Sequence, residues 1–89
     1  MKLSEIVQKI YDMNYCGECW VNIETMGNCT HIRIEYGDGY WGLYYFYINN
    51  QNKKIFDCSE LPANDDWKWL WKLWVDNVEI DLDMEDTNV

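Results

Sequence analysis

The chain has 89 residues, of which 48% are hydrophobic and 17% aromatic, and it carries a formal net charge of −9 at pH 7. This length predicts one small domain over residues 1–89, with a core rich in aromatic side chains. The acidity argues against direct binding of nucleic acid, because an anionic surface repels phosphates. The sequence has no run of about 20 apolar residues to cross a membrane and no signal peptide, so we expect a cytoplasmic protein with reduced cysteines.

The first two thirds of the chain predict a helix followed by a sheet. Four apolar residues at helical spacing predict a helix over residues 4–14, capped near Ser4. They are Leu3, Ile6, Val7 and Ile10. Alternating apolar and polar residues, separated by Gly- and Asn-rich turns, then predict four strands. These strands are expected at residues 19–26, 29–36, 40–48 and 53–58.

The pattern changes after Pro62. Asn64 is expected to cap a helix that ends near Asn77 and has Asp65 and Asp66 in its first turn. Its apolar stripe, with the spacing i, i+3, i+4 and i+7, is expected to face the core. The stripe consists of Trp67, Leu70, Trp71 and Trp74.

Residues 78–85 alternate again and predict an edge strand or an ordered tail, whereas residues 86–89 are expected to fray. The chain thus predicts an α+β fold in the order α-β-β-β-β-α-β. Its central element is an antiparallel β-meander of about four strands, with a Trp-rich C-terminal helix.

Negative charge is concentrated in residues 57–89, which contain ten carboxylates and two lysines. In the alternating segment, four carboxylates share one face: Glu79, Asp81, Asp83 and Glu85. Alternate strand residues lie about 6.7 Å apart, so this row is similar to the periodic charge of a nucleic-acid backbone. Other acids are expected to add to it. They are Asp57, Glu60, Asp65, Asp66 and Asp76.

This acidic row favours a protein that binds a basic partner. Two other interpretations predict the same pattern. One is a sheet edge that charge protects against aggregation, and the other is a solvated acidic tail.

Aromatic rings occupy both faces of the strand predicted at residues 40–48. One set must lie in the core, and the other is then exposed or buried in an oligomer. Trp41 and Tyr45 share a face and are candidates for contact with a partner, since exposed Trp and Tyr are typical of protein–protein interfaces. An aromatic interaction module, including a homodimer, is therefore an alternative function. A pocket that stacks a small molecule on these rings is a further one.

The four cysteines allow a zinc site. Cys16 and Cys19 have zinc-knuckle spacing, and Cys29 and Cys58, or His31, could complete the ligand set. A second close pair is absent, so free cysteines acting as small apolar side chains are the leading interpretation, ahead of a zinc-stabilised module or thiol redox chemistry. We therefore predict no metal and no cofactor.

Catalytic groups are scarce in this sequence. His31 is the only histidine, and neither Ser4 nor Ser59 has a base nearby in the sequence. Nucleophilic catalysis requires a base beside the nucleophile. The sequence therefore predicts a protein that is not an enzyme.

With these features the chain resembles the small, acidic α/β phage proteins that block host defence, in particular anti-CRISPR inhibitors. The resemblance is one of size, charge and architecture. It is carried by the opening helix Leu3-Ser4-Glu5-Ile6-Val7-Gln8-Lys9-Ile10, the compact meander and the acidic segment Val78–Asp86. It implies a stoichiometric inhibitor in the host cytoplasm whose acids occupy the basic channel of an RNA-guided nuclease.

Overall fold

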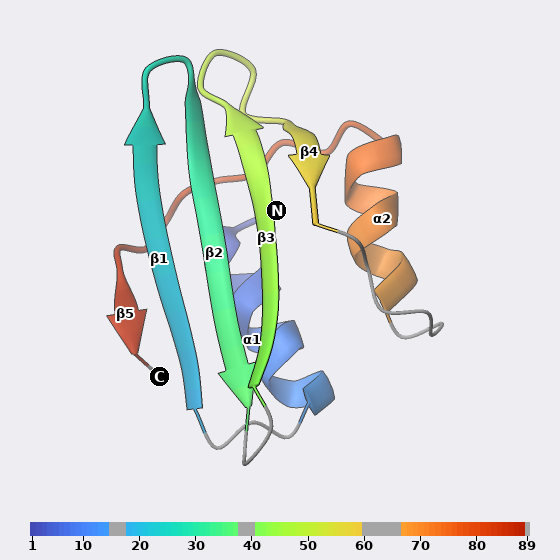
Figure 1. Cartoon of the computed structure of the whole chain (residues 1–89). Coiled ribbons are helices and arrows are strands. Elements are labelled where there is room, and N and C mark those ends of the chain that lie inside the picture. Colours follow the sequence, from blue (N-terminus) through green and yellow to red (C-terminus); the bar gives the residue numbers. More distant parts are fainter. Residues whose placement is uncertain (15–17, 38–40, 60–66, 89) are drawn as a thin grey trace.

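The computed structural model describes residues 1–14, 18–37, 41–59 and 67–88 (Figure 1). It confirms the predicted α+β fold and the predicted order of elements. The described elements are α1 (Leu3–Asn14), β1 (Glu18–Met26), β2 (Cys29–Gly37), β3 (Trp41–Asn49), β4 (Ile55–Cys58), α2 (Lys68–Val75) and β5 (Thr87–Asn88).

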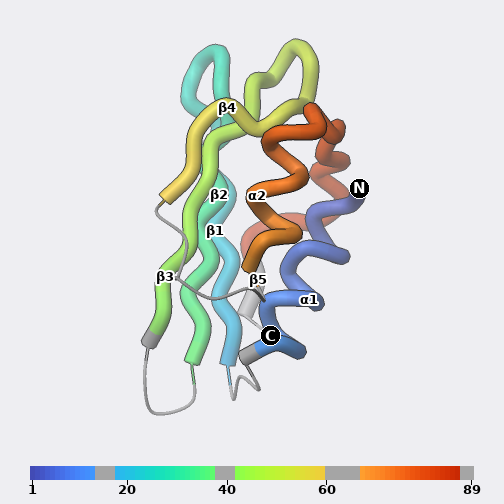
Figure 2. Tube along the Cα trace, turned by 90° about the vertical axis from the view of Figure 1, so that its right-hand side faces the viewer, coloured from blue at the N-terminus to red at the C-terminus, as the bar shows by residue number. Residues whose placement is uncertain are grey.

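One sheet organises the molecule, with the strand order β4-β3-β2-β1-β5 and antiparallel pairing throughout. Gly27 has φ 63° and is the first central residue of the two-residue turn between β1 and β2. This position favours glycine in a type II′ hairpin turn. Both helices lie on one face of the sheet, and none of the described residues forms a helix over the other face (Figure 2).

The core lies between the sheet and the helices, because the alternation along each strand directs one set of side chains toward α1 and α2. Tyr44, Phe46 and Ile48 on β3 are buried, whereas Leu43 on the opposite face is exposed. The neighbouring strands and both helices add further buried side chains. These include Leu3, Ile6, Val7, Ile10, Val21, Ile32, Ile34, Ile55, Trp67 and Leu70.

Helix α2 departs from its prediction at two points. It begins at Lys68 with no side-chain cap and no acid in its first turn, while Asn64, Asp65 and Asp66 lie outside the described residues. Trp71 was expected in the core but is 52% exposed. The helix buries Trp67 and Leu70 and packs Trp69, Leu73 and Trp74 partly against the core. The apolar face is thus rotated away from Trp71.

The predicted end of α2 near Asn77 is correct. Asn77 has φ 54°, the N–H of Asn77 donates to the carbonyl of Trp74, and the N–H of Val78 donates to the carbonyl of Leu73. These two bonds form a Schellman motif, in which Asn is one of the few residues that accept the left-handed conformation. The motif ends the helix and turns the chain toward the sheet.

The last segment differs from its prediction. Residues 78–85 do not form a regular edge strand. They cross the molecule as an extended segment with two isolated bridges, Lys54↔Glu79 and Lys2↔Asp81. The C-terminal strand is instead β5, where Thr87 and Asn88, expected to fray, pair with Val21 and Trp20. Residues far apart in sequence thus hold this segment.

Candidate functional site

The structure places the predicted acidic row on residues 78–86, which we call the acidic strap. The strap runs from the end of α2 behind the sheet to β5 (Figure 1). At its start, the N–H of Ile80 donates to the carbonyl of Lys53 at 2.8 Å. In its middle, the N–H of Leu3 donates to the carbonyl of Asp81, and the N–H of Asp81 donates to the carbonyl of Met1, both at 2.8 Å. The strap is therefore tied to two separate parts of the chain.

The alternation predicted for the strap is present. Ile80 is fully buried, and Val78, Leu82 and Met84 are half-buried against the core. The residues between them are exposed, namely Glu79, Asp81, Asp83 and Glu85. An extended backbone sends successive side chains to opposite sides, so anchoring the apolar side holds the four carboxylates on the solvent side.

Asp83 binds the beginning of α1. Its carboxylate accepts the backbone N–H of Ser4 at 2.9 Å and the Ser4 hydroxyl at 2.5 Å. The first N–H groups of a helix have no partner within the helix, so Asp83 caps α1 from a distant part of the chain. The hydroxyl bond and then the backbone bond hold the pKa of Asp83 below its usual range. Ser4 was predicted to cap the helix, but in the structure Ser4 is the donor and the carboxylate of Asp83 provides the cap.

Asp86 also has an internal role, which the sequence did not reveal. Its carboxylate accepts the backbone N–H of Ile23 at 2.6 Å and the side-chain amide of Asn22 at 3.3 Å. It therefore fixes the end of the strap on the edge of β1.

Three carboxylates of the strap differ from Asp83 and Asp86. Glu79, Asp81 and Glu85 are exposed, and within the described residues their carboxylates accept no hydrogen bond and form no ion pair. The strap thus leaves these three groups open to a partner.

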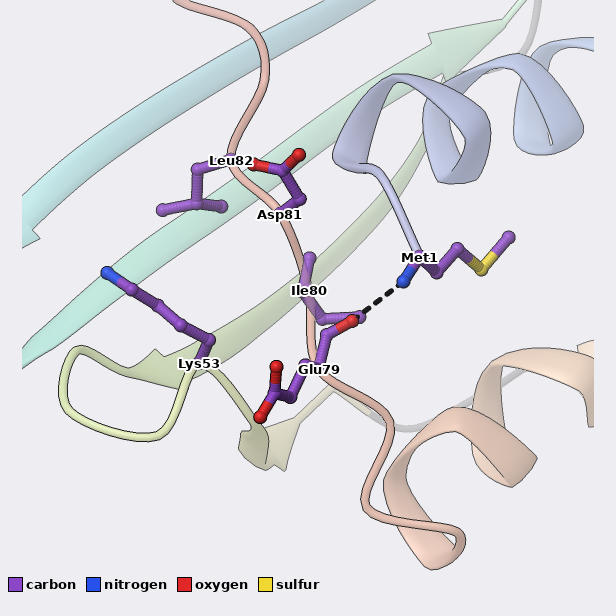
Figure 3. A pocket seen from close by; sticks show the side chains of 6 residues that line it. All are labelled: Met1, Lys53, Glu79, Ile80, Asp81 and Leu82. Carbon is purple, nitrogen blue, oxygen red and sulfur yellow. Dashed lines mark hydrogen bonds between the residues drawn. The ribbon is translucent and has the colours of Figure 1, made fainter.

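Three lysines that the sequence pattern did not indicate lie beside the first half of the strap. Lys54 and Lys2 form the bridges to Glu79 and Asp81. Lys53, with Met1 and the strap, lines a hollow of about 400 Å³, where the amino group of Met1 donates to the carbonyl of Glu79 at 2.8 Å (Figure 3). Among the described residues, the backbone bridges between lysines and the strap therefore lie at Glu79 and Asp81, in its first half.

The other acids that were expected to add to the row do not form one cluster with it among the described residues. Asp76 ends α2, where its carboxylate lies 3.9 Å from Lys72. Asp57 is exposed on β4. Glu60, Asp65 and Asp66 lie outside the described residues.

A second exposed surface is the helix-free face of the sheet, which we call the outer face. Trp20 on β1, Leu43 on β3 and Phe56 on β4 are 45%, 49% and 48% exposed. Between them, His31 stacks on Tyr47 with ring centroids 4.7 Å apart and meets the edge of Tyr45 at 5.6 Å. Tyr45, a predicted contact residue, is therefore half-buried among rings. The side chain of Trp41 lies outside the described part.

The cysteines do not assemble as a four-thiolate site. Cys19 pairs with Tyr36 at one end of the β1–β2 ladder and Cys29 with Met26 at the other, seven positions or about 23 Å apart along β1. Cys19 is buried in the core, and Cys58 lies beside Tyr44, where burial raises the pKa of its thiol. Cys16 lies outside the described residues, among which no three metal-binding side chains converge. Cys19 and Cys29 are therefore too far apart to bind one zinc ion together.

Comparison of the chain with protein-family models, with curated proteins and with solved structures finds no match. Among the described residues, neither helix is long and apolar enough to cross a membrane. Any functional interpretation therefore depends on the geometry of the two exposed surfaces.

Proposed function

We propose that the protein is a binding inhibitor that engages a basic nucleic-acid-binding protein through the acidic strap, in the manner of a nucleic-acid mimic. The resemblance to anti-CRISPR proteins implies that this partner is an RNA-guided nuclease in the cytoplasm of a bacterial host. The observation that carries the proposal is the open, anchored row of Glu79, Asp81 and Glu85.

Anchoring matters because a contact surface that is already ordered loses little conformational entropy on binding. The buried Ile80 and the backbone bonds to Met1, Leu3 and Lys53 supply this order. Carboxylates held in this way form charge-assisted hydrogen bonds with arginine and lysine. They also attract a basic partner from a distance, which raises the association rate at low salt.

A capture experiment tests the strap directly. The immobilised protein, exposed to a bacterial lysate at low salt, should retain a basic nucleic-acid-binding protein and release it near 1 M salt, where the screening length is about 3 Å. Duplex DNA or guide RNA added to the lysate should compete for the same protein. Retention that nucleic acid does not affect would contradict mimicry.

Two matched variants distinguish binding through the strap from attraction by the net charge of the protein. Replacing the three open carboxylates (Glu79→Gln, Asp81→Asn and Glu85→Gln) should reduce retention at least tenfold, which corresponds to about 1.4 kcal/mol shared by three contacts. Asp83 stays unchanged because it caps α1. The control removes three exposed acids elsewhere (Glu5→Gln, Asp12→Asn and Glu18→Gln) and should retain the partner. Equal losses in both variants would show that only net charge matters.

The outer face supports a second candidate function, an aromatic interaction module. Its support is the exposure of Trp20, Leu43 and Phe56 on a sheet face without a helix. Such a module, including a homodimer, should associate with little dependence on salt, because apolar burial does not rely on charge. A monomer at high concentration in light scattering would argue against self-association.

A further inference from the structure

The free edge of β1 is only partly covered. β5 pairs with Trp20 and Val21, and the carboxylate of Asp86 accepts the N–H of Ile23. From there to Met26, none of the described strands lies beside this edge, which forms the upper part of β1 in Figure 1.

The backbone of this stretch points outward at defined positions. In an antiparallel strand, every second residue directs its N–H and C=O to the same neighbour. The N–H of Ile23 meets Asp86 on the side away from β2, so Thr25 directs both its groups to that side too. Thr25 is exposed. The N–H and C=O of Thr25 and the C=O of Ile23 are thus available to an added strand.

A hollow beside this edge suggests what kind of side chain the added strand carries. It has a volume of about 400 Å³ and is lined by Ile23, Met84, Glu85 and Asp86. Ile23 and Met84 are half-buried apolar residues, whereas Glu85 is exposed with an open carboxylate. Lysine or arginine fits this arrangement, because its aliphatic stem covers apolar surface while its charge reaches a carboxylate.

We propose that the edge of β1 from Ile23 to Met26 binds an extended segment of a partner protein by strand addition, with a lysine or arginine of that segment in the hollow at Glu85. A second copy of the chain fits less well, because it would bring Glu24 and Glu85 of two molecules of charge −9 together,. The inference shares Glu85 with the proposed function but goes beyond it, since the site is the edge of β1 and Glu79 and Asp81 take no part in it.

The probe is a blocked hexapeptide in which lysine alternates with valine, so that the lysines share one face of a strand. In amide NMR of the whole protein, adding this peptide should shift the Thr25 amide and slow its hydrogen exchange at least tenfold. A peptide with glutamate in place of lysine should do neither. Failure of the lysine peptide to bind at millimolar concentration, or binding without protection of Thr25, would overturn the proposal.

Two variants at Thr25 separate strand addition from simple attraction of charge. Thr25→Pro removes the outward N–H, and proline is tolerated on an edge strand where its missing N–H faces solvent. It should weaken peptide binding about tenfold relative to Thr25→Val, which keeps the N–H. Equal binding by the two variants would contradict strand addition.

Charge variants cover the case in which the proline variant does not fold. Glu85→Gln should weaken the peptide about threefold at low salt, while Glu79→Gln with Asp81→Asn should leave binding unchanged. Weaker binding by the Glu79→Gln and Asp81→Asn variant would show that the peptide binds the strap instead. The result that contradicts strand addition therefore differs from the result that contradicts the proposed inhibitor function. Protection of Thr25 in the protein alone that grows with its concentration would indicate a second copy instead, and would overturn the proposal.

Discussion

The acidic strap and the outer face of the sheet are both exposed, but they offer a partner different chemistry. The strap buries its apolar side chains, bonds its backbone to the chain start and to Lys53, and leaves carboxylates in solvent. The outer face stacks His31 on Tyr47 and leaves apolar rings in solvent. Binding through the strap should therefore weaken with salt, and binding through the outer face should not.

The largest effect on stability should come from removing the buried side chain that anchors the strap. Ile80→Ala removes a fully buried side chain and should lower the free energy of unfolding by about 2–5 kcal/mol. Phe56→Ala on the outer face should cost less than about 1 kcal/mol, because half of this ring is already in water. Denaturant unfolding measures both. Similar costs would mean that the strap is no better anchored than an exposed ring.

The next effect concerns the cap that the strap provides. Asp83→Asn should lower the melting temperature by about 4 °C at pH 7, since the carboxylate no longer accepts two bonds from Ser4,. Because the pKa of Asp83 is lower in the folded state, its contribution is present above the usual pKa of aspartate and is lost as the pH falls through the lowered value. The two proteins should therefore converge in stability in acid.

A control distinguishes capping from general charge repulsion. Glu79→Gln, at an open position of the strap, should leave the melting temperature within about 2 °C of the original. If Glu79→Gln and Asp83→Asn changed the melting curve equally, the bonds to Ser4 would not be the cause.

Changes on the outer face should have little effect on stability. Trp20→Ser together with Phe56→Ser should change the free energy of unfolding by less than about 1 kcal/mol, because both side chains are about half exposed,. The same variant should abolish any salt-insensitive association seen by sedimentation. Association that persists in the variant would remove the outer face as an interface.

The local patterns of the sequence predicted most of the fold. Leu3, Ile6, Val7 and Ile10 formed the buried side of α1 as expected. Alternation correctly separated the two faces of β3, and the structure shows that the face with Tyr44 is the buried one. These predictions are correct because burial of one face imposes the helix or strand period on nearby residues. Trp71 was misplaced because apolar residues also occur beside the expected stripe, at Trp69 and Leu73, so periodicity alone did not fix the rotation of α2.

Long-range pairings were beyond reach of the sequence. Nothing local indicates that Asp83 caps Ser4, or that Asp86 accepts the N–H of Ile23, since these partners are 79 and 63 positions apart. The same holds for Met1 and Leu3, whose backbone bonds turn the expected edge strand into a strap. Two of the five acids from Glu79 to Asp86 are thus structural, and only the structure separates them from the open ones.

Hydrogen exchange of the strap amides tests most directly whether its carboxylates are held in place. The N–H groups of Ile80, Asp81 and Leu3 all donate to backbone carbonyls, so each should exchange as slowly as amides in the middle of β2 and β3. Fast exchange of these three amides while the sheet stays protected would contradict the anchoring of the acidic strap and identify the segment as a solvated acidic tail.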